Sequence, residues 1–343
     1  MAGMYRLLQR LGMEPVIVCD WNSQKDGFRI SAPAATDWKS FEIIIYHHSQ
    51  YWELGEELIH HSACPIVFKH HNITPARFFK PYFEHYYNVC AQGREQTKVF
   101  AADKRHAWLS DSNFSKQELA EDGLEPDRIR VVPPFNRVSQ LLQLQSEANY
   151  NSDIIELLFV GRTSPNKGHL HLLRVACVLM SEFGRPIKLR IVGALDPALN
   201  SYYDHIVRHI SDLGLGDHAE ILPHCGDNEL IELYRRSHLY VCLSEHEGFN
   251  VPITEAQAVG LPVLGAGAGA TGETAGPGQL FSEVPRSAEA DYFYASLIEE
   301  VFTDKNLRAQ LTLAGEHNVR ERFTDEVIEN AFVSAIYESI NHS

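Results

Sequence analysis

Two acidic residues eight positions apart flank a glycine turn at residues 244–255. The stretch reads Ser-Glu-His-Glu-Gly-Phe-Asn-Val-Pro-Ile-Thr-Glu, with Glu247 before Gly248 and Glu255 in the first turn of the helix that Pro252 is expected to open. A helix start leaves backbone N–H groups free, and such groups bind anions. Carboxylates on either side of the anion can hold the hydroxyls of the molecule that carries it. The pattern therefore predicts a nucleotide-sugar site.

A second loop, at residues 159–168, carries two cations. It reads Phe-Val-Gly-Arg-Thr-Ser-Pro-Asn-Lys-Gly, which places Arg162 at the end of an expected strand and Lys167 just before an expected helix. Both side chains can converge on one anion, and a departing diphosphate needs such neutralisation as its charge develops. The alternative is that Arg162 and Lys167 are two ordinary solvated cations.

The elements that must position these loops alternate between short apolar runs and amphipathic stretches, which predicts parallel sheets with right-handed crossovers. In such sheets ligands lie at the carboxyl ends of the strands. The expected strands cover residues 15–20, 41–46, 65–68, 107–110 and 128–132, then 154–160, 187–192, 220–222, 239–243, 261–265 and 279–281. A helix is expected over 4–11, and a further helical stretch from Arg77 to about Phe100.

Residues 136–152 are rich in Ser, Gln and Asn, as in a linker. We therefore expect an α/β protein with two doubly wound, Rossmann-like domains facing a cleft. The predicted boundaries are 1–135 for an acceptor-side domain, 153–325 for a donor-binding domain and 326–343 for a C-terminal helix.

The 343 residues have the balance of a globular protein, with 44% hydrophobic and 22% charged residues. Residues 1–150 carry 16 Lys and Arg against 18 Asp and Glu, a net −2, which leaves −13 of the total −15 for the remainder. Nucleic acid is not an expected partner, because no basic face is indicated. Without a long apolar run or a signal peptide, a cytoplasmic location is expected, and six scattered cysteines are expected to be reduced thiols.

The second half resembles the retaining GT-B glycosyltransferases of glycosyltransferase family 4. The resemblance rests on Gly161-Arg162, Pro165-Asn166-Lys167-Gly168, Gly193, residues 247–255, Gly260-Leu-Pro262-Val and Gly272-Glu273-Thr274. In the first half, residues 46–49, 69–75 and 110–114 resemble a bacterial subgroup that builds cell-surface polysaccharides and contains mannosyltransferases.

This resemblance implies roles for individual residues. Arg162 and Lys167 would bind the donor diphosphate and stabilise the departing nucleotide, and Glu247 would contact the transferred sugar. Glu255 would hold the ribose hydroxyls, and His71 would face the sugar across the cleft.

The remaining donor-binding positions that the resemblance implies are Gly161, Gly193 and the backbone of Gly248, Phe249 and Asn250. Retention is thought to proceed by front-face attack in this family, with the leaving phosphate taking the acceptor's proton, so no protein nucleophile is implied. Neither a metal nor another cofactor is expected.

Other features have competing interpretations. The histidine pairs at 47–48, 60–61 and 70–71 invite a metal reading, but a tandem pair on a strand points to opposite faces and cannot chelate as a helical i, i+4 pair does. The aromatic and basic run 77–87 is read as helix core with a solvated face. Contact with a membrane surface or a lipid-linked acceptor at the inner face of the membrane is the alternative.

One departure from the family concerns the first domain. Family members begin with a strand and a glycine-rich turn before the first helix, whereas here Ala2-Gly3 directly precedes that helix. The first domain is thus expected to lack one inner strand. The predicted function is a retaining hexosyltransferase that moves a sugar, with GDP-mannose the favoured donor, onto a glycan or lipid-linked acceptor. A non-catalytic nucleotide-sugar-binding or scaffold protein is the main alternative, and a sugar epimerase or phosphorylase of similar architecture is a third.

Overall fold

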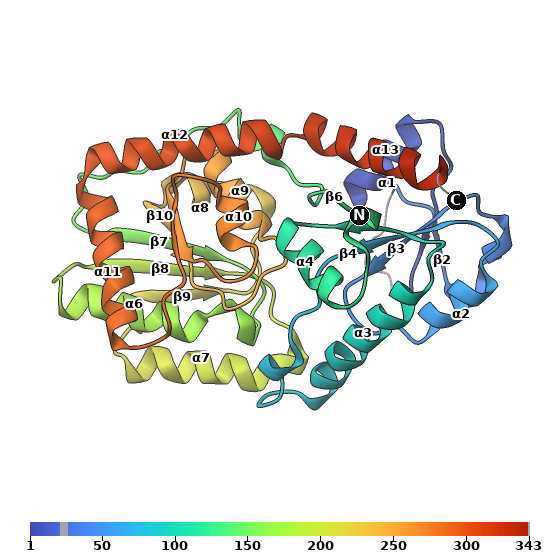
Figure 1. Ribbon diagram of the computed structural model, residues 1–343. Helices are drawn as coiled ribbons and strands as arrows, with labels where there is room; N and C mark the ends of the chain where they lie inside the picture. Colours follow the sequence, from blue (N-terminus) through green and yellow to red (C-terminus); the bar gives the residue numbers. More distant parts are fainter. Residues whose placement is uncertain (21–26, 342–343) are drawn as a thin grey trace.

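The computed structural model describes residues 1–20 and 27–341, and its chain forms two α/β halves that lie side by side (Figure 1). The described strands form a six-stranded, a four-stranded and a two-stranded sheet, and every strand pair is parallel. This confirms the predicted α/β class. The domain boundaries themselves remain predictions.

The six-stranded sheet of the second half has the order β12-β11-β10-β7-β8-β9. Its strands are β7 (Ile155–Val160), β8 (Ile187–Val192), β9 (Ala219–Leu222), β10 (Leu239–Cys242), β11 (Val263–Ala266) and β12 (Leu280–Ser282). The chain builds outward from β7 through β8 and β9, then returns to place β10 on the other side of β7. The strand order therefore reverses between β7 and β10, where doubly wound sheets bind ligands.

Helices cover both faces of this sheet. They are α6 (His169–Ser181), α7 (Asn200–Asp212), α8 (Asp227–Arg236), α9 (Val251–Ala258), α10 (Thr271–Ala275), α11 (Ala288–Thr303) and α12 (Lys305–Arg322), with 3-10 turns η5 (Pro165–Lys167) and η6 (Pro197–Leu199). Side-chain caps explain two of the starts, because Ser287 accepts a hydrogen bond at α11 and Asp304 accepts two at α12.

The four-stranded sheet of the first half consists of β3 (Ile44–His48), β4 (Ile66–His70), β5 (Ala107–Ser110) and β6 (Ile129–Val131), paired in chain order. Alternation along β4 divides its side chains between two cores. Val67 packs with α1 (Ala2–Arg10), whereas Phe68 packs with α2 (Leu54–His61) and α3 (Glu84–Ala102). The helix α4 (Asn113–Glu121) follows β5, and the 3-10 turn η4 (Pro126–Arg128) precedes β6.

The strand predicted at 15–20 is present but short. It forms β1 (Ile17–Val18), which pairs with β2 (Ile30–Ser31) in a sheet of its own rather than with the four-stranded sheet. Within the described residues, β3 is an edge of that larger sheet. Two 3-10 turns, η1 (Pro33–Ala35) and η2 (Trp38–Ser40), connect β2 to β3.

The predicted linker is more ordered than its composition suggested. It contains α5 (Val138–Leu141), and the side chains of Val138 and Leu141 are buried in the core of the second half. Residues three positions apart lie on one face of a helix, so this turn can bury both side chains together.

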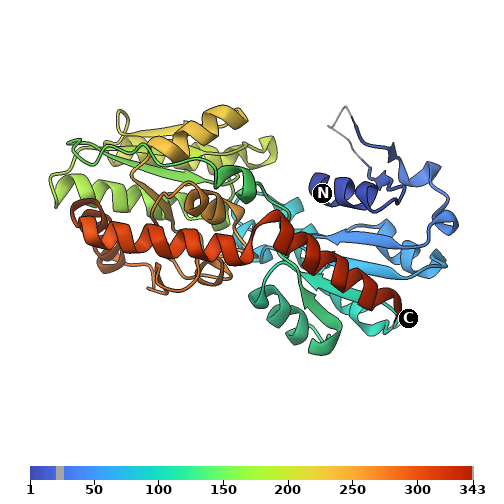
Figure 2. The ribbon, with the colours of Figure 1, turned by 90° about the horizontal axis from the view of Figure 1, so that it is seen from above.

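The last helix, α13 (Asp325–Asn341), crosses back to the first half, as Figure 2 shows. Phe332 and Ile336 of this helix pack with Met4 and Leu7 of α1. The predicted C-terminal helix is therefore present, and its predicted residues 342–343 lie outside the described residues.

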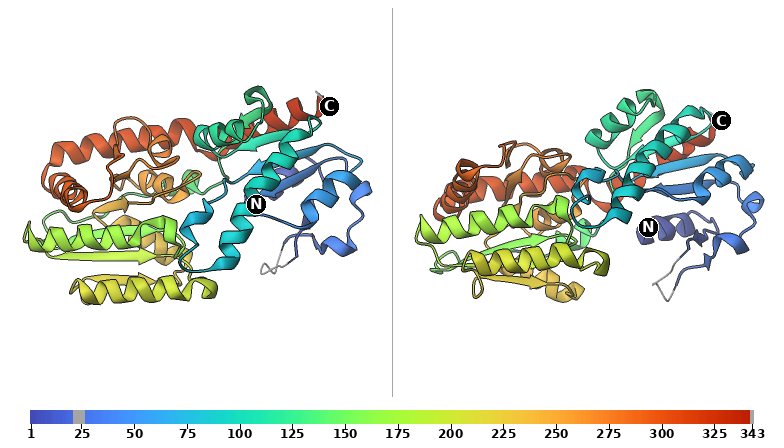
Figure 3. Two further views of the ribbon diagram at one scale, coloured as in Figure 1. Left: turned by 60° about the horizontal axis from the view of Figure 1, so that its bottom comes forward. Right: turned by 90° about the horizontal axis from the view of Figure 1, so that it is seen from below.

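The helix predicted from Arg77 begins later than expected. Residues 76–78 form the 3-10 turn η3, and α3 begins at Glu84. Pro81 explains the difference, because its ring excludes the residues before it from a continuous α-helix. The start of α3 lies beside α7 of the second half (Figures 1 and 3), where Tyr82 stacks edge-on against Tyr202.

Among the described helices, none has the length and apolar character needed to cross a membrane.

Candidate functional site

The two loops singled out from the sequence meet at the reversal of strand order. Nζ of Lys167, in the loop after β7, lies 2.8 Å from both carboxylate oxygens of Glu247, in the loop after β10. The side chain of Lys167 is 18% exposed and that of Glu247 is 7% exposed. Asn250 also donates a hydrogen bond from Nδ2 to Oε1 of Glu247. A partly buried cation and a carboxylate thus share one site at the sheet edge.

The turn after Glu247 has a constrained backbone. Asn250 lies in the left-handed region with a φ of 83°, immediately before α9. Asparagine tolerates this conformation better than most residues, and such conformations gather at functional sites. The helix itself begins at Val251, so Pro252 is its second residue rather than its first. The ring of Phe249 packs edge-on against Phe323 in the core, so only the backbone of Phe249 can line the site.

Gly161 and Gly193 lie together at the carboxyl ends of β7 and β8. A Cβ atom on Gly193 would lie 2.0 Å from the carbonyl oxygen of Gly161, and Gly193 has a φ of 158°. Only glycine permits this approach. Gly193 therefore has a structural reason to be glycine, and the contact of either glycine with a donor stays a prediction.

Arg162 is exposed, and it forms no hydrogen bond or ion pair within the described residues. Its charge acts on Tyr86 of α3, whose pKa burial and Asp196 raise to about 12 while Arg162 opposes them. The structure therefore places Arg162 near the first half and does not join it to Lys167.

Glu255 has partners that the sequence did not suggest. Its carboxylate accepts from Nε of Arg137 at 2.8 Å, from Nη2 of Arg137 at 3.3 Å and from the hydroxyl of Tyr234 at 3.0 Å. Burial raises the pKa of Tyr234 well above its usual value, so this hydroxyl stays protonated and donates. Arg137 comes from the predicted linker, where only its charge distinguished it from the neighbouring polar residues.

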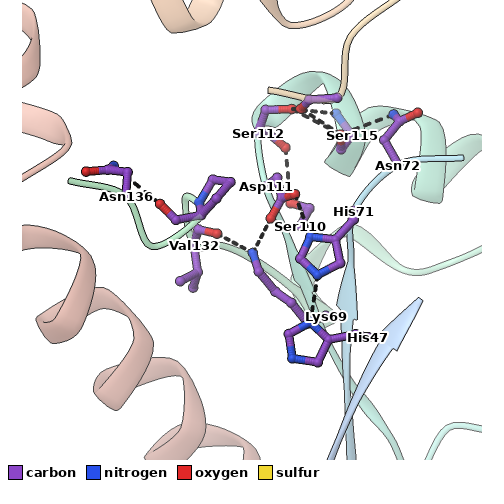
Figure 4. A network of polar contacts seen from close by, with 12 residues as sticks. His47, Lys69, His71, Asn72, Ser110, Asp111, Ser112, Ser115, Val132 and Asn136 are labelled. Carbon is purple, nitrogen blue, oxygen red and sulfur yellow. Dashed lines mark hydrogen bonds and ion pairs between the residues drawn. The ribbon is translucent and has the colours of Figure 1, made fainter. Parts of the chain in front are cut away.

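His71 lies in a chain of polar contacts at the carboxyl edge of the first sheet (Figure 4). Its Nδ1 lies 2.9 Å from Oδ2 of Asp111, and its Nε2 lies 2.7 Å from Nδ1 of His47. Lys69 pairs with Oδ1 of Asp111 at 2.5 Å and donates to the carbonyl of Val132.

Burial and neighbouring charges shift the pKa values of Asp111 and His47 in this series of contacts. Burial alone would raise the pKa of Asp111, but Lys69 and His71 outweigh it and hold the pKa at about 2. Burial and the neighbouring His71 lower the pKa of His47 to about 3. At neutral pH Asp111 is therefore ionised and His47 is neutral.

The first half reaches the acidic turn directly. The hydroxyls of Ser112 and Ser115 donate to the carbonyl of Gly248 at 2.7 and 3.2 Å. Nε2 of His246 donates to Oδ1 of Asn72 at 2.7 Å. A Cβ atom on Gly248 would lie 2.4 Å from Cβ of Asn72 and 3.2 Å from the carbonyl oxygen of His71. The close approach at Gly248 brings His71 beside the turn that holds Glu247.

A carboxylate of the second half also caps a helix of the first. Oε1 of Glu273 accepts from the backbone N–H and the side-chain amide of Asn113, and Oε2 accepts from the N–H of Phe114. These N–H groups begin α4, where a negative charge is favoured. Glu273 was recognised in the sequence only as part of a family motif, and its contact across the two halves was not expected.

The pair His47 and His48 on β3 separates as strand geometry requires, whereas His60 and His61 lie in the helix α2. His47 faces His71, while His48 contacts the hydroxyl of Thr97 in α3 at 2.8 Å. Across residues 1–20 and 27–341, no group of three or more His, Cys, Asp or Glu side chains is arranged to hold a metal ion. All six cysteines are free thiols, as predicted.

Two curated relatives resemble part of this chain. D-inositol 3-phosphate glycosyltransferase 1 of Catenulispora acidiphila is 30% identical over 183 residues, which cover 51% of this chain and 43% of that protein. MMP alpha-(1->4)-mannosyltransferase of Mycolicibacterium hassiacum is 28% identical over 231 residues, which cover 67% of this chain and 53% of that protein. The chain spans about half the length of these relatives.

The comparisons also place the fold and the family. The crystal structure of Anabaena HepE in complex with UDP and glucose matches 98% of this chain and 95% of its own, with a TM-score of 0.73 and 15% identity. This likeness shows the fold, which is the expected GT-B fold of two Rossmann-like halves. Residues 143–318 match the family described as glycosyl transferases group 1. Because that match covers just over half of the chain and includes both loops of the site, the chain belongs to the glycosyl transferases group 1 family.

Proposed function

We propose that this protein is a retaining hexosyltransferase of the family 4 type, which transfers mannose from GDP-mannose to a glycan or lipid-linked acceptor. The contact between Lys167 and Glu247 carries the proposal. It places one cation and one carboxylate side by side at the reversal of strand order, where a ligand with a diphosphate next to a sugar can meet both. The mannosyltransferase relative supports the choice of mannose.

The chemistry follows from charge. Lys167 would neutralise the diphosphate as its bond to the anomeric carbon breaks, with Arg162 as a second cation at the same edge. Glu247 would accept hydrogen bonds from sugar hydroxyls, which replace those it now accepts from Lys167 and Asn250. The acceptor hydroxyl would attack from the side of the departing phosphate, and that phosphate would take the proton.

Glu255 is proposed to bind the ribose, and this requires a rearrangement. Its two oxygens are engaged by Arg137 and Tyr234, so the ribose hydroxyls would replace at least one of these donors. A carboxylate that is already hydrogen-bonded pays less desolvation cost when it changes partner.

No metal is proposed, since the two cations can supply the neutralisation. Peripheral contact with the inner face of a membrane is proposed for the segment around η3, where Arg77 and Lys80 are exposed beside Phe78. Chelation with EDTA should then leave the transfer rate unchanged, and a lipid-linked acceptor should be used better in vesicles than in detergent.

The test is product analysis with a panel of nucleotide-sugars that includes GDP-mannose, UDP-glucose and UDP-N-acetylglucosamine. We expect transfer, or slow donor hydrolysis in the absence of an acceptor, with GDP-mannose preferred. The anomeric NMR signal of the product should show the configuration of the donor. An inverted anomeric signal would contradict the mechanism, and tight donor binding with neither transfer nor hydrolysis would indicate the non-catalytic alternative.

A further inference from the structure

Asp111, His71 and His47 form a hydrogen-bonded series, and the chemistry of its first member decides which ring nitrogens carry a hydrogen. An ionised carboxylate can only accept hydrogen bonds, so the 2.9 Å contact between Asp111 and His71 requires a hydrogen on Nδ1 of His71. In a neutral imidazole the other nitrogen then carries none. In the neutral form of His71, Nε2 is therefore an acceptor, whereas a doubly protonated ring would donate from both nitrogens.

This fixes the tautomer of the next ring. The 2.7 Å contact between the two imidazoles needs one hydrogen, and a neutral His71 cannot supply it, so with both rings neutral it lies on Nδ1 of His47. The geometry suits such a bond. The rings are inclined by only 17° and their centroids are 5.0 Å apart, so the two nitrogens point at one another nearly in plane. Nε2 of His47 is thus left as an unprotonated acceptor.

Both nitrogens of His71 are engaged, whereas Nε2 of His47 forms no hydrogen bond within the described residues. His47 is partly exposed, and its Nε2 is not one of the buried ring nitrogens that lack a partner. The groups whose charge acts on His47 are His71, the α-amino group of Met1, Lys69 and Asp111. Of these two rings, the one with a nitrogen left without a partner is therefore His47 and not His71.

The position of His47 suits a substrate contact. It lies near the carboxyl end of β3, on the same edge as His71 at the end of β4 and Asp111 at the end of β5. The backbone of His71 touches the acidic turn through Gly248, so this edge faces the proposed donor site.

We propose that His47 binds the substrate by accepting a hydrogen bond at Nε2 from a hydroxyl of the sugar, and that Asp111 and His71 are positioning residues that hold it in the required tautomer. This inference rests on the proposed function for the identity of the ligand. It does not rest on it for the tautomers, which follow from the contacts of Asp111, His71 and His47 when both rings are neutral.

The tautomers can be measured without any substrate. Long-range proton–nitrogen NMR of ¹⁵N-histidine protein distinguishes protonated from unprotonated ring nitrogens, and single His→Gln variants assign the signals. In the wild-type protein we expect both His47 and His71 to carry hydrogen on Nδ1. In Asp111→Asn the amide oxygen should turn to Lys69 and the amide N–H to His71. That reversal should move the hydrogen to Nε2 in both rings.

Two outcomes of this NMR measurement would overturn the inferred tautomers. Hydrogen on Nε2 of His47 in the wild-type spectrum would overturn the inference, and so would tautomers that remain unchanged in a folded Asp111→Asn protein. If Asp111→Asn fails to fold, the wild-type spectrum still decides.

The ligand is tested by comparing GDP-mannose with GDP in calorimetry. His47→Phe removes the acceptor atom, and His47→Gln keeps one, while His317→Gln on the exposed face of α12 is the matched control. We expect His47→Phe to weaken GDP-mannose binding by about three- to tenfold, the worth of one hydrogen bond, and to leave GDP binding unchanged. His47→Gln should recover part of the loss.

Equal affinity of the wild-type protein and both His47 variants for GDP-mannose would overturn the contact. If the wild-type protein bound no nucleotide at all, the proposed function would fail and the ligand with it, while the tautomer measurement would still decide the roles of Asp111 and His71. The two failures are thereby distinguishable.

Discussion

Nζ of Lys167 lies 2.8 Å from each carboxylate oxygen of Glu247, although the two residues are eighty positions apart in the chain. They meet because β7 and β10 are neighbours in the sheet and each loop leaves the carboxyl end of its strand. Each charge is the main partner of the other. A donor that contacts both side chains can replace this ion pair, because it gives each buried charge a new partner.

The pairing itself can be tested through stability. Lys167→Met should lower the free energy of unfolding by about 1–3 kcal/mol, because it leaves the nearly buried carboxylate of Glu247 without its cation. Adding Glu247→Gln should restore part of the loss. Denaturant unfolding of both single variants and the double variant measures the coupling, with Lys305→Met on exposed α12 as the control. Additive effects of the two substitutions would show that the contact contributes nothing to stability.

The close approach at Gly248 predicts that the two halves can touch only if residue 248 has no side chain. In Gly248→Ala the new Cβ would meet Cβ of Asn72 at 2.4 Å, and both belong to tightly held segments. We expect the halves to separate locally and the transfer rate to fall by at least tenfold, with little change in secondary structure. Gly216→Ala, where nothing lies within 4 Å of the new atom, is the matched control. Wild-type activity in Gly248→Ala would contradict this contact.

Glu273 is predicted to hold the two halves together through α4. In Glu273→Gln the side chain can no longer offer a charged acceptor to the N–H groups of Asn113 and Phe114. Hydrogen exchange at these two amides should become faster by several-fold, while exchange in β10 stays unchanged. Glu316→Gln, a surface substitution on α12, should alter neither rate. If exchange at Asn113 and Phe114 is the same in both variants, the cap has no role in closure.

Buried histidines predict loss of stability in mild acid. Burial lowers the pKa of His48 to about 4 and that of His169 to about 3, below the ordinary value of 6.5 that each regains on unfolding. The unfolded chain therefore binds more protons, so stability is complete above about pH 6.5 and falls as the pH drops towards 3–4.

Each such histidine adds a slope of about 1.4 kcal/mol per pH unit within that window. Denaturant unfolding between pH 7 and pH 5 measures the total slope, and His48→Gln should reduce it by roughly the share of one group. A stability that does not change between pH 7 and pH 5 would show that these histidines are not held neutral by burial.

Much of the second half could be predicted from the sequence because its signals are local. The apolar run 239–243, the glycine turn and the start of α9 are all encoded within twenty residues, and the parallel arrangement follows from the alternation of strands and helices. The meeting of the loops that hold Lys167 and Glu247 followed from the same rules, since both lie at strand ends.

The contacts that were missed are non-local. Arg137 reaches Glu255 from a segment whose composition suggested a linker, and nothing near Arg137 in the sequence indicates a carboxylate partner. The pairing of Asp111 with Lys69 and His71 depends on the register of β4 and β5, which the sequence does not specify. The late start of α3 was readable from Pro81, and the prediction overlooked it.

The central claim is that a nucleotide-sugar binds between the loops of Lys167 and Glu247. The most direct measurement is calorimetric titration of GDP and GDP-mannose into the wild-type protein and Lys167→Ala, with Lys305→Ala as control. We predict saturable binding to the wild-type and control proteins and an affinity at least tenfold weaker for both ligands in Lys167→Ala. Equal affinity in a folded Lys167→Ala protein would contradict the assignment of this site.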